Sequence, residues 1–445
     1  MNQRRYFGTD GVRGTVGTSP LTADFALRLA NAAAQVLTPE GGRVLIGKDT
    51  RLSGYMFESA LEAGFVAAGV DAVLIGPLPT PGIAYMTMLL ECDFGVVISA
   101  SHNKYDDNGI KFFDKNGEKI SDDLELQIEK LLEEEPITRE SRRLGRASRV
   151  DKMRTKYQDF CASTVPEDMT LEGFRLVVDC ANGAGYKVAP RVFADLGADI
   201  VPIGTSPNGR NINEGCGSTE PELLRHLVPG VKADAGIALD GDGDRIVMVD
   251  AEGNLVDGDQ ILYILAKERV ETGTLNGPVV GTVMSNLGLE NAIVALGIPF
   301  LRAKVGDRYV LEMLRKEGGV LGGEPSGHVL TLDKTTTGDA IVVALQVLAA
   351  MKRTGKSLKE LAEGMQHTPQ VMVNVRLSEK FNPNDSEMVQ SEVALVTKEL
   401  GASGRVVLRA SGTEPLVRVM VEAEDAGVAK EQAERLAEVV RNAAG

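Results

Sequence analysis

Short apolar runs recur along most of this chain, separated by segments long enough for a helix, as in βαβ units. We expect strands at 44–47, 72–75 and 94–97, then at 176–178, 200–203 and 235–239, and again at 279–283 and 300–303. Runs of this kind are typical of mixed or parallel sheets covered by helices. Because 445 residues are too many for one hydrophobic core, the pattern predicts three α/β units in succession.

The end of the chain has a different order of elements. From about residue 370 it reads as a strand, a helix, two strands and a final helix, at 371–377, 385–399, 405–409, 417–423 and 429–443. This order predicts a small α+β domain with an antiparallel sheet. We therefore expect four domains, at 1–153, 154–251, 252–367 and 368–445.

A loop of small polar residues, Ser99-Ala100-Ser101-His102-Asn103, follows the apolar strand at 94–97. Ser101 is thereby placed at the carboxyl end of a strand, where open α/β sheets bind their ligands. Most loops rich in serine are only turns. No Gly-x-Ser-x-Gly elbow surrounds Ser101 and His102 has no partner at triad spacing, so acyl-transfer chemistry is poorly supported.

Three carboxylates at alternate positions, Asp240, Asp242 and Asp244, follow the strand at 235–239. The calcium loop of an EF-hand is excluded, because its sixth and twelfth positions would be Arg245 and Ala251 instead of glycine and glutamate. A surface turn is the other alternative, but three clustered acids repel one another unless a cation compensates them. The spacing predicts a Mg²⁺ site, and together with a serine hydroxyl it indicates phosphoryl transfer.

A glycine-rich segment at 322–328 carries groups that suit a sugar. Glu324 and Ser326 can bind two vicinal hydroxyls, and His328 adds an imidazole. The alternative is a plain turn between two strands.

A second loop, at 409–415, carries hydroxyl groups and backbone N–H groups between Arg409 and Arg418. Donors of this kind form a phosphate-binding nest, which we favour over a hairpin with surface arginines. In two other segments, Arg13 follows a glycine-rich turn and can reach an anion, and Lys111 is either a charge neutraliser or a surface lysine.

Charge and composition exclude several classes of partner. The formal net charge is −15 and the pI is near 5.0, so the chain has no basic face for nucleic acid. No apolar run is long enough to span a bilayer and the N-terminal residues lack a signal sequence. The four cysteines lack metal-ligand spacing and are expected to be buried thiols. We expect a cytoplasmic protein with no nucleic-acid or membrane partner.

The chain resembles the α-D-phosphohexomutase family over its whole length. The resemblance rests on four motifs in order: FGTDGVRG at 7–14, SASHN at 99–103, DGDGDR at 240–245 and RASGTEPLVRV at 409–419. It implies three α/β domains and a last α+β domain around a central cleft. The sequence departs from the family pattern at Lys104, where proline is usual, and at Pro325, where glutamine or methionine is common.

The resemblance also implies roles for individual residues. Ser101 would carry a phosphoryl group in the resting enzyme, and three aspartates would hold one Mg²⁺ with an oxygen of that phosphate: Asp240, Asp242 and Asp244. The implied catalytic residues are Ser101, Lys111, Arg13, His102 and Arg245. The implied substrate-binding residues are Glu324, Ser326, His328, Arg409, Ser411, Gly412, Thr413 and Arg418.

The implied activity is interconversion of glucosamine 6-phosphate and glucosamine 1-phosphate through a 1,6-bisphosphate, feeding UDP-N-acetylglucosamine and cell-wall precursor synthesis. Glucosamine or glucose 1,6-bisphosphate would prime the serine, and a homodimer is compatible with the sequence. Glucose or mannose phosphates are alternative substrates within the family. The alternatives outside it are a metal-dependent sugar phosphatase with Asp240 as nucleophile, and a non-enzymatic sugar-phosphate-binding regulator.

Overall fold

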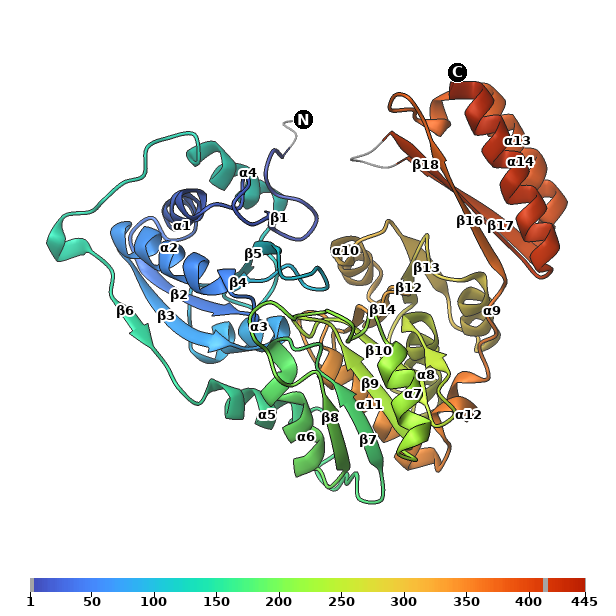
Figure 1. Ribbon diagram of the computed structural model, residues 1–445, viewed down its shortest axis with the longest axis horizontal. Helices are drawn as coiled ribbons and strands as arrows, with labels where there is room; N and C mark the ends of the chain where they lie inside the picture. The colour runs from blue at the N-terminus through green and yellow to red at the C-terminus, as the bar shows by residue number, and fades with distance from the viewer. Residues whose placement is uncertain (1–3, 411–414, 445) are drawn as a thin grey trace.

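The computed structural model describes residues 4–410 and 415–444, which form four sheets with their own helices (Figure 1). The first sheet has the order β1-β5-β4-β2-β3-β6 and is mixed, because β1 and β5 run antiparallel to their neighbours. Its strands are β1 (Val12–Thr15), β2 (Gly42–Lys48), β3 (Val70–Pro77), β4 (Phe94–Ile98), β5 (Asp107–Asp114) and β6 (Ala147–Arg149). Its helices are α1 (Ala23–Leu37), α2 (Ser53–Ala67), α3 (Thr80–Leu89) and α4 (Asp122–Leu131).

The second sheet has the order β11-β10-β9-β7-β8. Its elements are α5 (Met153–Ser163), β7 (Arg175–Asp179), α6 (Ala189–Asp195), β8 (Asp199–Ile203), α7 (Glu222–Gly230), β9 (Ala235–Leu239), β10 (Ile246–Asp250) and β11 (Leu255–Val256). Strand β11 lies beyond residue 251 and still pairs with β10. The second sheet therefore extends past the position at which we expected the second unit to end.

The third sheet has the order β13-β12-β14-β15, with only β15 antiparallel to its neighbour. Its elements are α8 (Gly258–Glu271), β12 (Val279–Thr282), α9 (Leu287–Ala295), β13 (Phe300–Ala303), α10 (Asp307–Glu317), β14 (Leu321–Gly323), β15 (Val329–Thr331), α11 (Ala340–Thr354) and α12 (Leu358–Ala362). Asp339 caps α11 by accepting hydrogen bonds from the N–H groups of Ile341 and Val342.

The C-terminal unit is a three-stranded antiparallel sheet backed by two helices, as the element order predicts. Its elements are β16 (Gln370–Arg376), α13 (Glu387–Leu400), β17 (Gly404–Ala410), β18 (Leu416–Ala423) and α14 (Ala426–Ala444). Its core is a separate cluster that includes Val375, Val419 and Leu436. One continuous core, in contrast, joins side chains of the first three units. The first three units are thus packed together, and the fourth is an attached body.

The structure confirms the predicted strands and the α/β class. No individual helix was predicted at α3, α5, α8, α9, α10 or α12, although the βαβ spacing leaves room for α3 and α9. Residues Val12–Thr15, which sequence alone presents as part of a turn, form edge strand β1. The four cysteines are buried free thiols, as predicted. None of the helices in the described residues has both the length and the apolar character needed to cross a membrane.

Candidate active site

Ser101 lies in the loop that follows β4, at the edge of the first sheet that faces the second unit. Its side chain is fully buried, and its Oγ donates a hydrogen bond of 2.6 Å to Asp240 Oδ2. Asp244 Oδ1 lies 3.5 Å from the same Oγ. The backbone of Ser101 has φ = +52°, in the left-handed region that serine rarely enters. The structure therefore brings together the serine and the carboxylate loop, which are about 140 residues apart in sequence.

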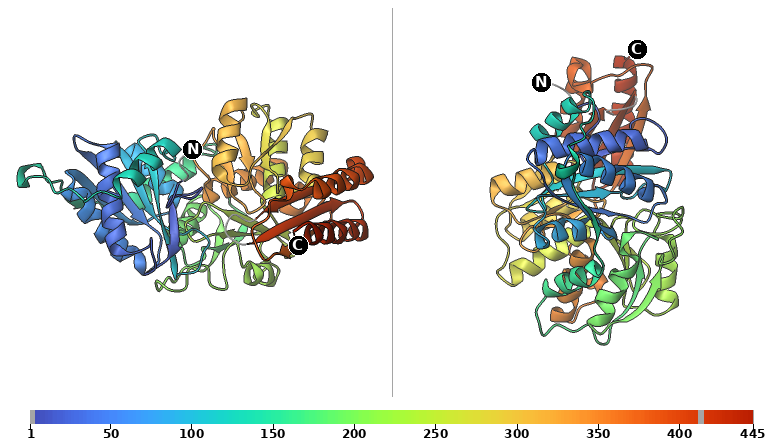
Figure 2. Two further views of the ribbon diagram at one scale, coloured as in Figure 1. Left: turned by 90° about the horizontal axis from the view of Figure 1, so that it is seen from above. Right: turned by 90° about the vertical axis from the view of Figure 1, so that its left-hand side faces the viewer.

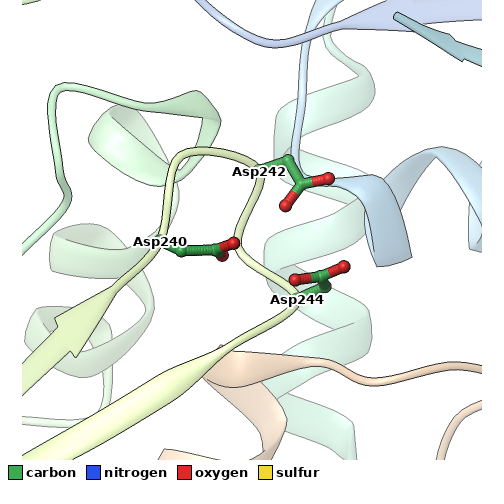
Figure 3. A group of neighbouring side chains, drawn as sticks. All are labelled: Asp240, Asp242 and Asp244. Atoms are coloured by element: carbon green, nitrogen blue, oxygen red, sulfur yellow. The ribbon is translucent and has the colours of Figure 1, made fainter. Parts of the chain in front are cut away.

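The three aspartates lie on the tight turn between β9 and β10, and their carboxylates face a common space (Figure 3). Oxygen atoms of Asp240, Asp242 and Asp244 lie within 4.8 Å of one another. Asp242 Oδ1 is buried and has no hydrogen-bond partner among the described residues. An orphaned buried carboxylate oxygen beside two more carboxylates fits a hard divalent cation with oxygen ligands.

The three carboxylates do not have equal electrostatic surroundings. Burial and the charges of Asp244 and Asp242 raise the pKa of Asp240 well above its usual value. Burial is the largest single influence on Asp242 and acts to raise its pKa, but three groups together outweigh it: the ammonium of Lys111 2.9 Å away, a hydrogen bond of 2.7 Å from Thr80, and the charge of Arg13. The net effect is a lowered pKa for Asp242. A divalent cation would relieve the repulsion that raises the pKa of Asp240.

Lys111 connects the carboxylate loop to the N-terminal motif. Its Nζ lies 2.9 Å from Asp242 Oδ2 and 2.9 Å from Asp10 Oδ2. Asp10 also pairs with Arg13 and, at 2.5 Å, with Lys119. Although burial acts to lower the pKa of Lys111, its carboxylate neighbours raise it, so the lysine stays charged.

A cavity of about 260 Å³ lies beside this network, between the first, second and third units. It is lined by Tyr6, Gly8, Thr9, Asp10, Gly11, Arg13, Asp244, Arg245, Gly306, Asp307, Glu324 and His328. Both ring nitrogens of His328 are buried and find no hydrogen-bond partner within residues 4–410 and 415–444, and Glu324 Oε1 accepts the N–H of Gly306 at 3.1 Å. The cavity thus offers cations and hydrogen-bonding side chains together, which suits an anionic polar ligand.

His102 lies next to the serine, with its Nδ1 3.4 Å from Ser101 Oγ. Burial and the neighbouring charges of Arg245 and Arg13 lower the pKa of His102 to about 4. The imidazole is therefore neutral at neutral pH.

Some residues with predicted roles lie away from this centre. Ser326 is exposed and does not line the cavity. Arg409 and Arg418 are direct neighbours on β17 and β18, in the C-terminal unit at the opposite end of the molecule from the first unit (Figure 2). The predicted phosphate-loop residues Ser411, Gly412 and Thr413 lie outside the described residues. The roles of all these residues stay predictions.

Four residues of the ion pairs and hydrogen bonds around Lys111 and Asp242 were not predicted from the sequence: Asp10, Thr80, Lys119 and Asp307. Asp10 lies inside the motif at 7–14, and its place between glycines could have singled it out. Thr80, Lys119 and Asp307 belong to three segments without any shared local pattern.

Profiles of the phosphoglucomutase/phosphomannomutase family match the chain in four parts. The alpha/beta/alpha domains I, II and III match residues 4–138, 155–253 and 257–368, and the C-terminal domain matches residues 372–439. The phosphoglucosamine mutase of Actinobacillus succinogenes is 57% identical to this chain over 443 residues, which cover 99% of this chain and 100% of the relative. The enzyme of the same name from Pasteurella multocida is 55% identical over 442 residues, with the same coverage.

Solved structures agree with this result. A phosphoglucomutase/phosphomannomutase family protein of Burkholderia thailandensis superposes with a TM-score of 0.82 at 26% identity, covering 100% of this chain and 98% of the other. An N-acetylphosphoglucosamine mutase of Aspergillus fumigatus, solved with GlcNAc-6P and magnesium, shares the fold with a TM-score of 0.70 at 20% identity, covering 100% of this chain and 96% of that one. The chain belongs to the phosphoglucomutase/phosphomannomutase family, the α-D-phosphohexomutases.

Proposed function

We propose that this protein is a phosphomutase that interconverts glucosamine 6-phosphate and glucosamine 1-phosphate. Phosphorylated Ser101 donates its phosphoryl group to the sugar, and a glucosamine 1,6-bisphosphate forms. The bisphosphate turns over and returns its other phosphoryl group to Ser101. In each transfer a hydroxyl oxygen of the acceptor bonds to phosphorus as the bond between phosphorus and the donor oxygen breaks.

The observation that carries this proposal is the contact between Ser101 Oγ and Asp240 Oδ2 at 2.6 Å, within the aspartate triad and beside a cavity that contains arginines. Asp240, Asp242 and Asp244 would hold one Mg²⁺, which when bound neutralises charge on the transferring phosphoryl oxygens. Arg13 and Arg245 line the cavity and can stabilise the same charge.

Binding of the sugar is assigned to the third and fourth units. Glu324 and His328 lie in the cavity and can bind hydroxyl groups of the ring. Arg409 and Arg418 would hold the phosphate that is not being transferred, once the C-terminal unit closes over the cleft. Because the C-terminal unit has a core of its own, it can move without disrupting the cores of the other units.

A phosphatase with Asp240 as nucleophile is less favoured. The side chain of Asp240 is fully buried, and one of its oxygens accepts the hydroxyl of Ser101. Ser101 is buried to the same degree, but the carboxylate of Asp240 already accepts the serine hydroxyl and would serve as a ligand of the metal ion.

The test is a comparison of kcat/KM for glucosamine, glucose and mannose 6-phosphates with the same bisphosphate primer. One contact to the C2 amino group is expected to favour the amino sugar by about 10- to 150-fold. A neutral sugar that equals or exceeds glucosamine 6-phosphate would refute the substrate but leave the mutase reaction in place. Release of inorganic phosphate without isomerisation would refute the mutase reaction itself.

A further inference from the structure

Arg51 is a fully buried arginine just after β2, and all five of its guanidinium N–H donors have acceptors around the Ser101 loop. Nη2 donates to the carbonyl oxygens of Ser101 at 3.0 Å and Asn103 at 2.7 Å. Nη1 donates to the carbonyl oxygen of Asp107 at 3.0 Å and to that of Lys104. Four carbonyl groups of one loop and its exit therefore point at a single side chain.

The fifth donor connects Arg51, through Asp49 and Ser99, to the backbone N–H of Ser101. Its Nε donates to Asp49 Oδ2 at 2.8 Å, and this oxygen also accepts the hydroxyl of Ser99 at 2.6 Å. The hydroxyl oxygen of Ser99 in turn accepts the N–H of Ser101 at 2.9 Å. Both the carbonyl and the N–H of Ser101 are thus fixed through Arg51 and Asp49.

Asn213 approaches the same loop from the second unit. Its Nδ2 donates to the carbonyl oxygens of Ser101 and Asn103, both at 2.9 Å, which are the two carbonyls that Arg51 Nη2 binds. Asn213 is itself buried, and its N–H is held by the carbonyl oxygen of Ala181 at 2.9 Å. The loop is therefore bound by side chains of two different units.

We propose that Arg51 and Asn213 form a clamp that positions Ser101 for phosphoryl transfer by binding the carbonyl groups of its loop from two units. This inference rests on the proposed function, in which Ser101 carries the phosphoryl group. Neither Arg51 nor Asn213 lines the cavity, so both are positioning residues.

Two physical effects follow from the clamp. It holds Ser101 at φ = +52°, a backbone conformation that serine keeps only when its surroundings enforce it. It also turns the negative ends of four carbonyl dipoles toward a guanidinium instead of toward a phosphoryl group on Ser101 Oγ. Both effects act on the transferring group and neither acts on the sugar, so loss of the clamp should lower kcat and leave KM nearly unchanged.

The first test variant is Arg51→Lys, which keeps the positive charge but has three donors on a flexible chain and cannot reach four carbonyls at once. The second is Asn213→Ala, which removes both bonds from the second unit to the loop. The left-handed backbone of Asn213, with φ = +55°, is less favourable for alanine, and this cost in stability is kept apart from kcat by expressing kcat per phosphorylated chain. Arg139→Gln is the matched control, because Arg139 also binds carbonyl oxygens of the first unit, those of Pro39 at 2.8 Å and Ala68 at 3.4 Å, at a distance from Ser101. Each variant is incubated with glucose 1,6-bisphosphate, and the fraction phosphorylated on Ser101 is measured by mass spectrometry.

The kinetic constants are then expressed per phosphorylated chain, so a variant that merely contains fewer folded molecules keeps the wild-type kcat. We expect Arg51→Lys to lower kcat about 100-fold, the effect of displacing a reacting group by about 1 Å, with KM changed less than about 3-fold. We expect about a 10-fold loss for Asn213→Ala and none for Arg139→Gln. If Arg51→Lys does not fold, Asn213→Ala decides.

A wild-type kcat per phosphorylated chain in both Arg51→Lys and Asn213→Ala would overturn the clamp. An increase in KM without a decrease in kcat would overturn it as well. If the wild-type protein takes no phosphate on Ser101, the proposed function fails instead, so the two failures are distinguishable.

Discussion

Replacing Lys111 by methionine tests the charge balance of the site, because it removes the ammonium while nearly keeping the volume of the side chain. Lys111 is 2% exposed, and its Nζ lies 2.9 Å from both Asp242 and Asp10 and 3.7 Å from Asp244. Without the ammonium these buried carboxylates repel one another with less compensation. We expect the metal-free variant to be less stable than the metal-free wild-type protein.

The magnitude is limited by proton uptake. A carboxyl group with an ordinary pKa of about 3.9 takes up a proton at pH 7 at a cost of about 4 kcal/mol. A carboxylate that loses the ammonium can take up a proton instead, so the loss of stability from its unpaired charge does not exceed this cost. Breaking a buried ion pair from one side costs about 3–5 kcal/mol, in agreement with that limit. We therefore expect a loss of about 4 kcal/mol in the free energy of unfolding.

The assay is urea unfolding of both proteins in EDTA and in excess MgCl₂. If Asp240, Asp242 and Asp244 form a cation site, Mg²⁺ replaces the missing positive charge and restores most of the lost stability of Lys111→Met. Lys48→Met is the matched control, since Lys48 and Glu58 form a buried pair at 2.6 Å away from the carboxylate loop. A loss in Lys111→Met that is the same with and without Mg²⁺, or an equal recovery in Lys48→Met, would refute the reasoning.

Asp242→Asn should lower activity through weaker metal affinity, measured as the Mg²⁺ concentration for half-maximal rate, and EDTA should inactivate the wild-type enzyme reversibly; an EDTA-insensitive rate would contradict the metal site. Arg418→Ala should lower kcat/KM by the equivalent of about 1.5–3 kcal/mol, while Ser101 is still phosphorylated by the bisphosphate. An unchanged kcat/KM would mean that other residues bind the phosphate that is not being transferred. Burial raises the pKa of Asp339 to about 6, although Tyr157 donates a hydrogen bond to it at 2.7 Å. Between about pH 4 and pH 6 the folded state therefore keeps a proton on Asp339 that the unfolded state has released. This contribution to stability is fully present below about pH 4 and is lost as the pH rises through 6, so the free energy of unfolding falls by about 3 kcal/mol. Urea unfolding from pH 4 to 7 should show this loss in the wild-type protein but not in Asp339→Asn, and parallel curves would contradict it.

The parts of the site that sequence predicts are local. The strand at 94–97 is a continuous buried run followed by small polar residues, and the aspartates at 240–244 alternate within a single turn. Each pattern fits within about ten residues, so it can be recognised without knowledge of the sheet order. The structure places both where the sequence predicts them.

The parts that sequence does not predict depend on topology. Asp10 meets Lys111 because β1 pairs with β5, and Asp307 meets Lys119 only because the first and third units pack together. Arg51 binds carbonyl groups that are about fifty residues further along the chain, and such groups leave no signal in side-chain patterns. Helix α3 was missed for another reason, since its residues are apolar on nearly all sides and show no helical period.

The central claim is that Ser101 carries the phosphoryl group. The most direct measurement is mass spectrometry of the intact protein with peptide mapping, after incubation with glucose 1,6-bisphosphate and again after addition of excess glucosamine 6-phosphate. We expect one phosphate per chain, located on Ser101, which leaves the protein as the sugar is converted. A protein that turns over substrate with no phosphate on Ser101, or with the phosphate on Asp240, would contradict the account.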